Sequence, residues 1–272
     1  MKSNAPARQA GARGHRLAAL LTDTFWGRLT LRATALAIVL IAWQMAGDDS
    51  VALLFPTATR TFQAFIELMA DGRLPLGLLV TGQALLAGFA IIIGIGVPLG
   101  ILIARFPLVD RTVSPYFTFL VAVPIIAIVP VVQALLGLTF AARVTVIVLF
   151  GISYVVINSA IAVRRVKPEL IEMAASFGAR RLAILTQVVL PAAVPGIMTG
   201  ARLALGQALI GMVVAELTIV GAGVGSLIAE LQGRFKVAAV LAVAMTIVLI
   251  GLCLLSLVEM LERRLNRWSL TK

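Results

Sequence analysis

Side chains able to carry acid–base, nucleophilic or metal chemistry are scarce in this sequence. It has one histidine, His15, in a polar N-terminal stretch, and one cysteine, Cys253, inside an apolar run. Glu216 is the one acidic residue well within a long apolar stretch. An enzyme needs several ionisable groups converging on one place, and one cysteine cannot build a disulfide or a cysteine-rich metal site within a chain. We therefore predict no catalytic residue and no bound metal, and we expect His15 to be a solvated residue without a role.

The sequence also lacks a phosphate-binding loop. The P-loop pattern G-x4-G-K-[ST] is absent, so any ATP must be bound by another polypeptide. Gly94, Gly96 and Gly100 form a glycine-rich run, but no strand precedes them. Gly96 and Gly100, like Gly196 and Gly200, are four residues apart in apolar sequence, which is typical of closely packed helices. We interpret both pairs as packing positions.

The composition is that of a membrane protein. Hydrophobic residues make up 61% of the 272 residues and charged residues 13%, and the mean hydropathy is +1.06. Each crossing of the lipid needs about 20 mostly apolar residues. Six apolar stretches are candidates, at 33–47, 76–104, 113–138, 144–163, 196–220 and 237–258. They lack the alternation of strands, and backbone polar groups in lipid must be satisfied internally. We predict an all-α membrane protein with six transmembrane helices.

Basic residues are distributed unevenly between the two predicted sides. With the N-terminus inside, 18 of the 23 Lys and Arg residues fall in inner segments; the outer ones are Arg60, Arg73, Arg143, Arg234 and Lys236. Basic loops are retained on the cytoplasmic side, so we predict that both termini are cytoplasmic. The same bias accounts for the net charge of +11, and we expect no nucleic-acid partner. The longest outer loop, 48–75, contains a stretch at 57–70 that favours a short amphipathic helix.

The chain is predicted to be one domain with two short tails. Residues 1–32 form a cytoplasmic N-terminal tail, in which 17–31 is expected to be an interfacial helix rather than part of a cleavable signal. The transmembrane domain covers 33–258, and 259–272 form a cytoplasmic C-terminal tail.

A cytoplasmic loop at 164–195 interrupts the apolar chain between the fourth and fifth predicted spans. Its first helix is expected to start at Pro168, which suits a first turn, with Glu169 and Glu172 near the positive end of the helix dipole. Gly178 is expected to end this helix in the left-handed conformation. The apolar residues recur at helical spacing and predict one stripe: Leu170, Met173, Ala174 and Phe177.

A second short helix is predicted over 179–189, with Arg180 and Arg181 at its start. Its apolar side is expected to hold Leu182, Leu185 and Val189. Pro191 is expected to end it, and Pro195 to let the chain turn into the fifth span. The two helices would form an angled bracket. Its apolar face either rests on lipid headgroups or on its own bundle, or docks a soluble cytoplasmic protein.

The stretch from Glu172 to Pro191 resembles the coupling loop of bacterial ATP-binding-cassette importer permeases, whose pattern is E-A-A-x3-G-x9-I-x-L-P. Glu172 opens the match, Gly178 stands at the glycine, and Met173 and Val188 replace an alanine and the isoleucine with apolar side chains. The resemblance implies that this segment receives force from the ATPase subunits. The residues it implies for ATPase coupling are Glu169, Leu170, Glu172, Met173, Ala174, Phe177, Gly178, Arg181, Leu190 and Pro191.

Further stretches are similar to the sulfonate, nitrate and taurine permease branch of that family. They are GVPLG at 96–100, PGIMTGARLALGQAL at 195–209, VVAEL at 213–217 and LERRLNRW at 261–268. The likeness covers about residues 50–268, but the WFGIG-like segment of the branch is replaced by LLGLTFAAR at 135–143. The resemblance implies a type I importer permease-like fold that moves a small organic or inorganic anion into the cytoplasm. An aromatic carboxylate or a pyrimidine-type solute is the alternative.

The resemblance also implies the partners and the location. These are two cytoplasmic ATPase subunits that bind ATP and Mg²⁺, a second copy of this permease, a periplasmic solute-binding protein, and the lipid of the bacterial inner membrane. This chain itself is expected to bind no cofactor. A stand-alone channel or secondary transporter fits the hydropathy but leaves the 164–195 loop without a role, and the sequence shows no strong internal repeat.

Prolines and polar residues inside the spans are the candidates for a translocation pathway: Pro124, Pro130, Gln133, Asn158, Gln207 and Glu216. The prolines are expected to kink the third span, and they either shape the bundle or line the path. The amides, together with Gln83, either bond to a neighbouring helix or contact solute. Glu216 lies fourteen residues after Arg202, about 21 Å along a helix. It is expected to face the interior near the outer side, as a structural hydrogen-bonding group or in gating.

Overall fold

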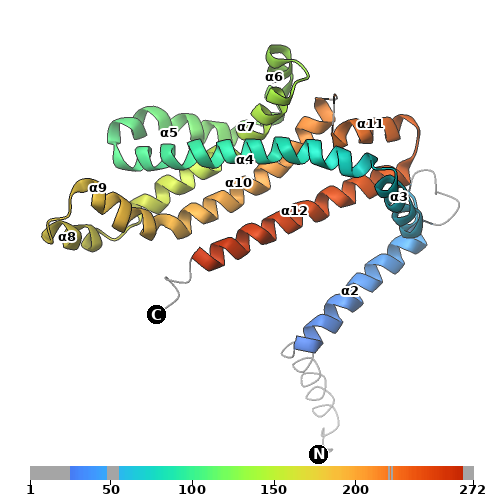
Figure 1. Ribbon diagram of the computed structural model, residues 1–272, viewed down its shortest axis with the longest axis horizontal. Helices are drawn as coiled ribbons and strands as arrows, with labels where there is room; N and C mark the ends of the chain where they lie inside the picture. The colour runs from blue at the N-terminus through green and yellow to red at the C-terminus, as the bar shows by residue number, and fades with distance from the viewer. Residues whose placement is uncertain (1–24, 48–54, 220, 222, 266–272) are drawn as a thin grey trace, which may run out of the picture.

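The computed structural model describes residues 25–47, 55–219, 221 and 223–265, and every regular element in them is helical. Three long helices lie along one another at the centre of the molecule: α4 (Arg73–Arg105), α7 (Phe140–Arg164) and α10 (Leu190–Thr218) (Figure 1). A fourth, α12 (Val237–Leu265), packs against α10. The all-α prediction is confirmed.

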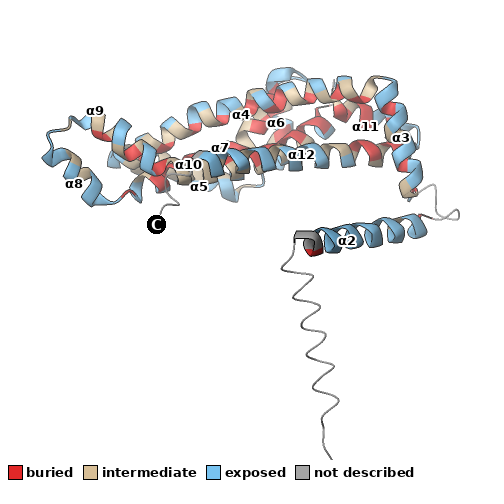
Figure 2. Cartoon of the chain, turned by 60° about the horizontal axis from the view of Figure 1, so that its bottom comes forward, coloured by how far each residue is buried: buried red, intermediate tan, exposed pale blue. Residues whose placement is uncertain are grey.

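Small residues let the central helices approach one another closely. A Cβ atom on Gly100 would lie 2.6 Å from the Cβ of Ser159, and one on Gly196 would lie 2.5 Å from the Cβ of Ala162. These contacts confirm that the glycine pairs are packing positions. Buried residues gather where the central helices face one another (Figure 2), and the core between them includes Ile92, Ile147, Val155, Ala204 and Ala208.

Five helices of the described chain are long and apolar enough to cross a membrane, and a sixth span results if one bent pair is counted together. The predicted spans at 76–104, 144–163, 196–220 and 237–258 correspond to α4, α7, α10 and α12. The structure extends α12 through residue 265, into the predicted C-terminal tail. The hydropathy pattern therefore located these helices but not their ends.

The third predicted span, 113–138, bends at Pro124, where a kink was expected, but it is broken there and does not continue as one kinked helix. It consists of α5 (Pro107–Ala122), the 3₁₀ turn η1 (Ile125–Ile128) and α6 (Val129–Leu136). The two halves meet at 97°. Val123 is extended because it precedes a proline, and Pro124 has no N–H with which to continue the helix. Pro130, which was expected to add a kink, lies in the first turn of α6, where proline is tolerated.

The predicted stop at Pro191 is also wrong. Three pieces follow one another without interruption: α9 (Arg181–Ala183), the π-helical η2 (Ile184–Val189) and α10. Before the proline, the N–H of Leu190 donates to the carbonyl of Leu185, five residues back. In a regular α-helix the proline ring would collide with the carbonyl four residues back, and the wider π turn relieves this conflict. Pro195 lies inside α10 and makes no turn.

The N-terminal part of the described chain differs from the predicted tail. Helix α2 (Phe25–Ala46) starts before residue 32, so 25–31 of the expected interfacial helix belong to it. Residues 17–24 and His15 lie outside the described residues. The apolar stretch Leu29–Ala46 is 0% buried within this chain (Figure 2). The expected helix at 57–70 is confirmed as α3 (Ala58–Ala70), capped by the hydroxyl of Thr57.

The bundle has two distinct ends (Figure 1). At the α8 end lie α8 (Pro168–Ser176) and α9, which form the loop between α7 and α10. At the α11 end lie α3 and α11 (Val224–Gly233), a short helix between α10 and α12 that the sequence analysis did not predict. The long helices connect these two ends.

Candidate functional site

The 168–191 segment forms an angled bracket at the α8 end. Pro168 is in the first turn of α8, and the helix ends at a left-handed glycine, Gly178, with φ +75°. Two hydrogen bonds close this helix end: the Gly178 N–H donates to the Ala175 carbonyl at 2.9 Å, and the Ala179 N–H to the Ala174 carbonyl at 3.1 Å. This pattern is a Schellman motif. The predicted conformation of Gly178 is confirmed.

The apolar side chains of the segment are divided between two faces. Ile171, Ala174 and Leu185 pack on a core of the chain itself, formed with Ile184 and Val189. Outward-facing residues are Leu170, Met173, Phe177 and Leu182, which are 36%, 54%, 86% and 71% exposed. Ala174 therefore leaves the predicted stripe, and Leu182 does not share a side with Leu185 and Val189. The inward face fixes the bracket to the bundle, and the outward face is exposed among the residues that the structure describes.

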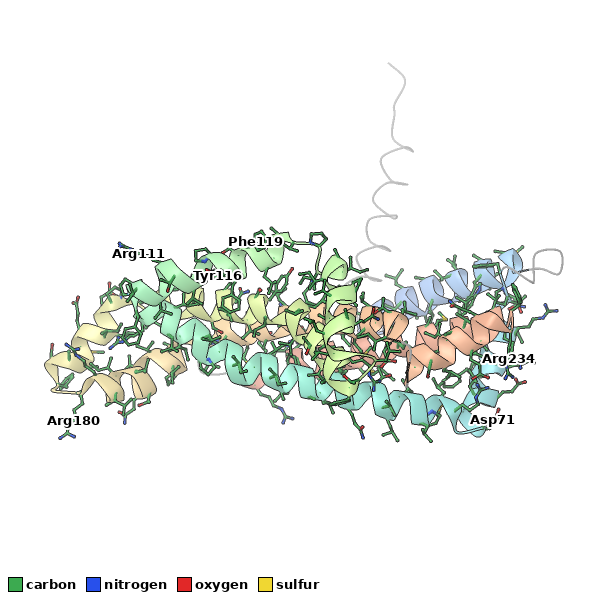
Figure 3. All side chains as sticks on the ribbon, turned by 90° about the horizontal axis from the view of Figure 1, so that it is seen from above. Asp71, Arg111, Tyr116, Phe119, Arg180 and Arg234 are labelled. Carbon is green, nitrogen blue, oxygen red and sulfur yellow. The ribbon has the colours of Figure 1, made fainter. Side chains whose placement is uncertain are left out.

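Charged side chains surround the exposed face. Glu169, Glu172, Arg180 and Arg181 are all exposed. None of these four has an ion-pair partner among the residues that the structure describes. Arg180 projects from the tip of the bracket, away from the bundle (Figure 3). The outward surface thus combines apolar side chains with unneutralised charge of both signs, which is suited to a protein partner.

The bracket connects directly to the core of the bundle. Leu190 is half-buried and Pro191 is exposed, and both lie in the first turn of α10. Because α9, η2 and α10 are continuous, the second arm of the bracket is the beginning of the long helix that packs on α4 and α7. A displacement of the bracket would therefore act on the centre of the molecule without passing through a flexible joint.

A second group of functional candidates is buried at the α11 end. We call the side chains of Thr81, Arg143 and Glu216 the buried cluster. Arg143 Nη1 lies 3.3 Å from Glu216 Oε1, and the Thr81 hydroxyl donates to the same oxygen at 2.9 Å. The other carboxylate oxygen accepts the N–H of Gly225 at 2.9 Å. The cluster joins α4, α7 and α10 to the start of α11.

The turn between α10 and α11 fits tightly around this carboxylate. A Cβ atom on Gly225 would lie 1.9 Å from the Glu216 carbonyl oxygen, so only glycine fits there. The N–H of Val224 donates to the Thr81 hydroxyl oxygen at 3.0 Å. Glu216 faces the interior, and its carboxylate accepts hydrogen bonds from Thr81 and Gly225. The sequence analysis did not identify Arg143 or Thr81 as members of a site. Arg143 could have been noticed, because it is an arginine one turn into the apolar helix α7. Nothing in the sequence distinguishes Thr81.

The other pathway candidates do not come together at one place. Gln133 donates to the Thr218 carbonyl at 2.7 Å, and Asn158 donates to the Tyr154 carbonyl within its own helix. Pro124 lies at the break after α5, and Gln207 lines a cavity beside that break. In the described residues no group of three or more His, Cys, Asp or Glu side chains is arranged to hold a metal ion.

Residues 96–267, more than half of the chain, match the family described as binding-protein-dependent transport system inner membrane component. The riboflavin transport system permease protein of Chloroflexus aurantiacus is 31% identical, covering 90% of this chain and 91% of that protein. The aliphatic sulfonates transport permease protein of Bacillus subtilis is 30% identical, covering 85% of each. The nitrate import permease protein of Synechocystis is 25% identical, covering 93% of this chain and 95% of that protein.

A solved structure has the same fold. A chain of the MetNI methionine ABC transporter, in an inward-facing conformation, superimposes with a TM-score of 0.53 at 20% identity. The match covers 74% of this chain and 96% of that chain. The two chains thus share one fold.

Proposed function

We propose that this chain, which belongs to the family of binding-protein-dependent transport system inner membrane components, couples ATP hydrolysis on separate subunits to the passage of a solute through its helices. It is a multi-pass inner-membrane permease subunit of an ATP-binding-cassette importer. The observation that carries the coupling proposal is the continuous helix from the 168–191 segment into α10.

The outward face of the 168–191 segment is the proposed ATPase contact. Met173 and Phe177 are 54% and 86% exposed, and together with Leu170 they give an apolar ridge that would enter a groove on the ATPase. Glu172 and Arg181 flank the ridge and would make polar contacts around it. Ile171 and Ala174 attach the bracket to its own bundle, so force applied to the ridge acts on α10.

The remaining partners follow from the same proposal. Two ATPase subunits bind ATP and Mg²⁺ and contact two copies of this permease, a periplasmic protein delivers the solute, and both permease termini are cytoplasmic. The basic-residue bias supports this orientation. A cysteine introduced by Ser50→Cys should react with a membrane-impermeant maleimide only from the periplasmic side. Labelling only from the cytoplasmic side would reverse the topology, and a native mass with one permease per active complex would exclude the dimer.

The proposed solute is a small molecule of the sulfonate, nitrate or taurine type. Relatives named for sulfonate and nitrate transport support this proposal. The alternative is a solute that carries a ring, such as an aromatic carboxylate or a pyrimidine, and the relative named for riboflavin transport favours that alternative. Both classes are compatible with the same coupling mechanism.

Phe177→Ser tests the coupling proposal. The substitution removes the most exposed apolar side chain of the ridge without altering the inward face, so the permease should still insert and fold. Loss of a hot-spot aromatic side chain typically weakens binding by about 2 kcal/mol, or roughly thirtyfold. We expect the ATPase to be lost during co-purification and ATP hydrolysis to lose its stimulation by solute.

Phe62→Ser is the matched control. Phe62 is 63% exposed on α3, at the opposite end of the bundle. Its replacement should leave ATPase association at the wild-type level. Wild-type association and full transport in Phe177→Ser would remove the main support for the coupling role. Solute uptake by liposomes that contain this chain without any ATPase would instead support a channel or secondary transporter.

A further inference from the structure

A small cavity lies beside the break between α5 and η1. Its volume is about 120 Å³. Three polar residues on its wall come from two helices: Ser153 and Tyr154 from α7, and Gln207 from α10. The rest of the wall is apolar, and it includes Leu120 and Val123 before the break and Ile125 after it. No charged side chain lines it.

The polar groups on this wall have no partners within the described chain. Ser153 is 2% exposed, and its hydroxyl has no hydrogen-bond partner. The hydroxyls of Thr118 and Ser256, by contrast, donate to the carbonyl four residues back. The Gln207 amide and the Tyr154 hydroxyl also make no hydrogen bond with the described residues. A buried polar group without a partner is costly, and Ser153 is such a group; the half-buried Tyr154 and Gln207 add two further unbonded polar groups to the same wall, which points to a ligand.

The break in the chain adjoins the cavity. Pro124 has no N–H, so it cannot donate to the carbonyl of Leu120, which lines the cavity. The cavity lies next to the point where the chain turns by 97°. A group that entered it would meet neutral donors and acceptors on α7 and α10 and apolar side chains elsewhere.

Size and charge restrict what the cavity can hold. An apolar cavity of about 150 Å³ is known to accept benzene, so this smaller cavity of about 120 Å³ holds at most a single ring. An anion that entered would lose its hydration without gaining a cation, which is unfavourable in a site of low dielectric. A small uncharged group could form hydrogen bonds with Ser153, Tyr154 and Gln207 and at the same time fill the space between the apolar side chains of the wall.

We propose that this cavity is a subsite of the translocation path that takes an uncharged, hydrogen-bonding group about the size of one ring. The proposal rests on the proposed function of this chain as a permease, and for the solute it favours the ring-bearing alternative over the compact anions of the sulfonate or nitrate type. The solute would bind through the hydroxyls and the amide and leave as the helices around the break rearrange. Gln207 thereby keeps the pathway role predicted from sequence, and Ser153 and Tyr154 join it.

Charge-selective labelling of a cysteine in the cavity tests this proposal. Ser153→Cys is placed in a Cys253→Ala background, and the complex with its ATPase subunits is reconstituted in nanodiscs with ATP. Two thiol reagents are compared, the uncharged methyl methanethiosulfonate and the anionic sulfonatoethyl methanethiosulfonate. Each rate is divided by the rate with free cysteine in the same buffer. We expect the uncharged reagent to react at least tenfold faster than the anionic one.

Ser159→Cys is the matched control on the same helix. Ser159 is fully buried and also has no hydrogen-bond partner, but it packs against Gly100 rather than on the cavity. The uncharged reagent should modify position 153 at least tenfold faster than position 159. Equal normalised rates for the two reagents at 153 would overturn the preference for an uncharged group. Equal rates at 153 and 159 would overturn the cavity as a solute site. ATPase association, measured on the same sample, reports separately on the proposed function.

Discussion

The 168–191 segment and the buried cluster use charge in opposite ways. In the segment, Glu172 and Arg181 are exposed and have no ion-pair partner among the described residues, beside a phenylalanine that is 86% exposed. In the cluster, Glu216 and Arg143 are 4% and 7% exposed and are paired with each other. The charged groups of the segment are left without partners among the described residues, whereas those of the buried cluster pair with each other within one chain.

This difference indicates where the molecule depends on other proteins. A buried carboxylate that accepts hydrogen bonds from a hydroxyl and a backbone N–H, and pairs with a guanidinium, is satisfied without outside help. An exposed apolar ridge flanked by unpaired charges buries its apolar surface and pairs its charges only when another molecule binds over it. Changes in the cluster should therefore act on folding, whereas changes in the segment should act on assembly.

The largest effect is expected from Glu216→Leu. The substitution keeps a side chain of similar size but leaves the charge of Arg143 buried without its carboxylate. Breaking a buried pair in this way costs about 3–5 kcal/mol. We expect a large drop in the thermal unfolding midpoint of the purified permease in detergent. Glu230→Gln is the control, because Glu230 pairs with Arg73 and Arg234 at the surface, where such pairs contribute about 0–1 kcal/mol.

A double variant separates the charge effect from the packing effect. Glu216→Leu combined with Arg143→Met replaces the pair by apolar side chains, which is often close to neutral for stability. It should recover much of the stability that the single variant loses. If Glu216→Leu and Glu230→Gln unfold at the same temperature, the buried cluster contributes no more to stability than a surface ion pair, and it does not stabilise the fold as described above.

The sequence predicted the long helices well because hydropathy reports burial in lipid directly. It could not predict how far the chain bends at Pro124, because a proline signals a lost hydrogen bond and carries no information on direction. It also assigned a stop to Pro191, although the π turn at Ile184–Val189 lets the helix continue. Ile184 and Val189 within that turn pack on the core. A proline in the sequence signals a conflict with a regular helix, but it does not say whether the chain stops there or widens its turn.

Among the functional candidates, the prediction from sequence was correct for the residue whose role depends on backbone conformation. Gly178 was identified because a helix end of this type requires a residue that tolerates a positive φ. Ala174 was placed on the wrong face because Ile171 was left out of the helical pattern, and Ile171 determines which side turns inward. Arg143 was assigned to an outer loop because its partner, Glu216, is 73 residues away in sequence. Pairing over that distance depends on the fold.

A smaller effect on stability than that of Glu216→Leu, and the sharpest contrast between regions, is expected from Gly178→Val compared with Gly72→Val. The two glycines have φ values of +75° and +73°, and a Cβ atom at either would meet nothing within 4 Å. Valine should cost about 1–3 kcal/mol of local strain at each position, with no steric clash. Both variants should insert in the membrane and show similar small decreases in unfolding temperature.

Only Gly178→Val should affect the ATPase, because only Gly178 sets the angle of the bracket that carries Met173 and Phe177. We expect its ATPase association to fall roughly tenfold, a change of about 1.4 kcal/mol, in a titration of ATPase onto the immobilised permease. Gly72 lies between α3 and α4 at the other end, so Gly72→Val should bind the ATPase as the wild type does. Equal losses in the two variants would mean that strain anywhere in the chain weakens the complex, and the bracket would then have no special part in coupling.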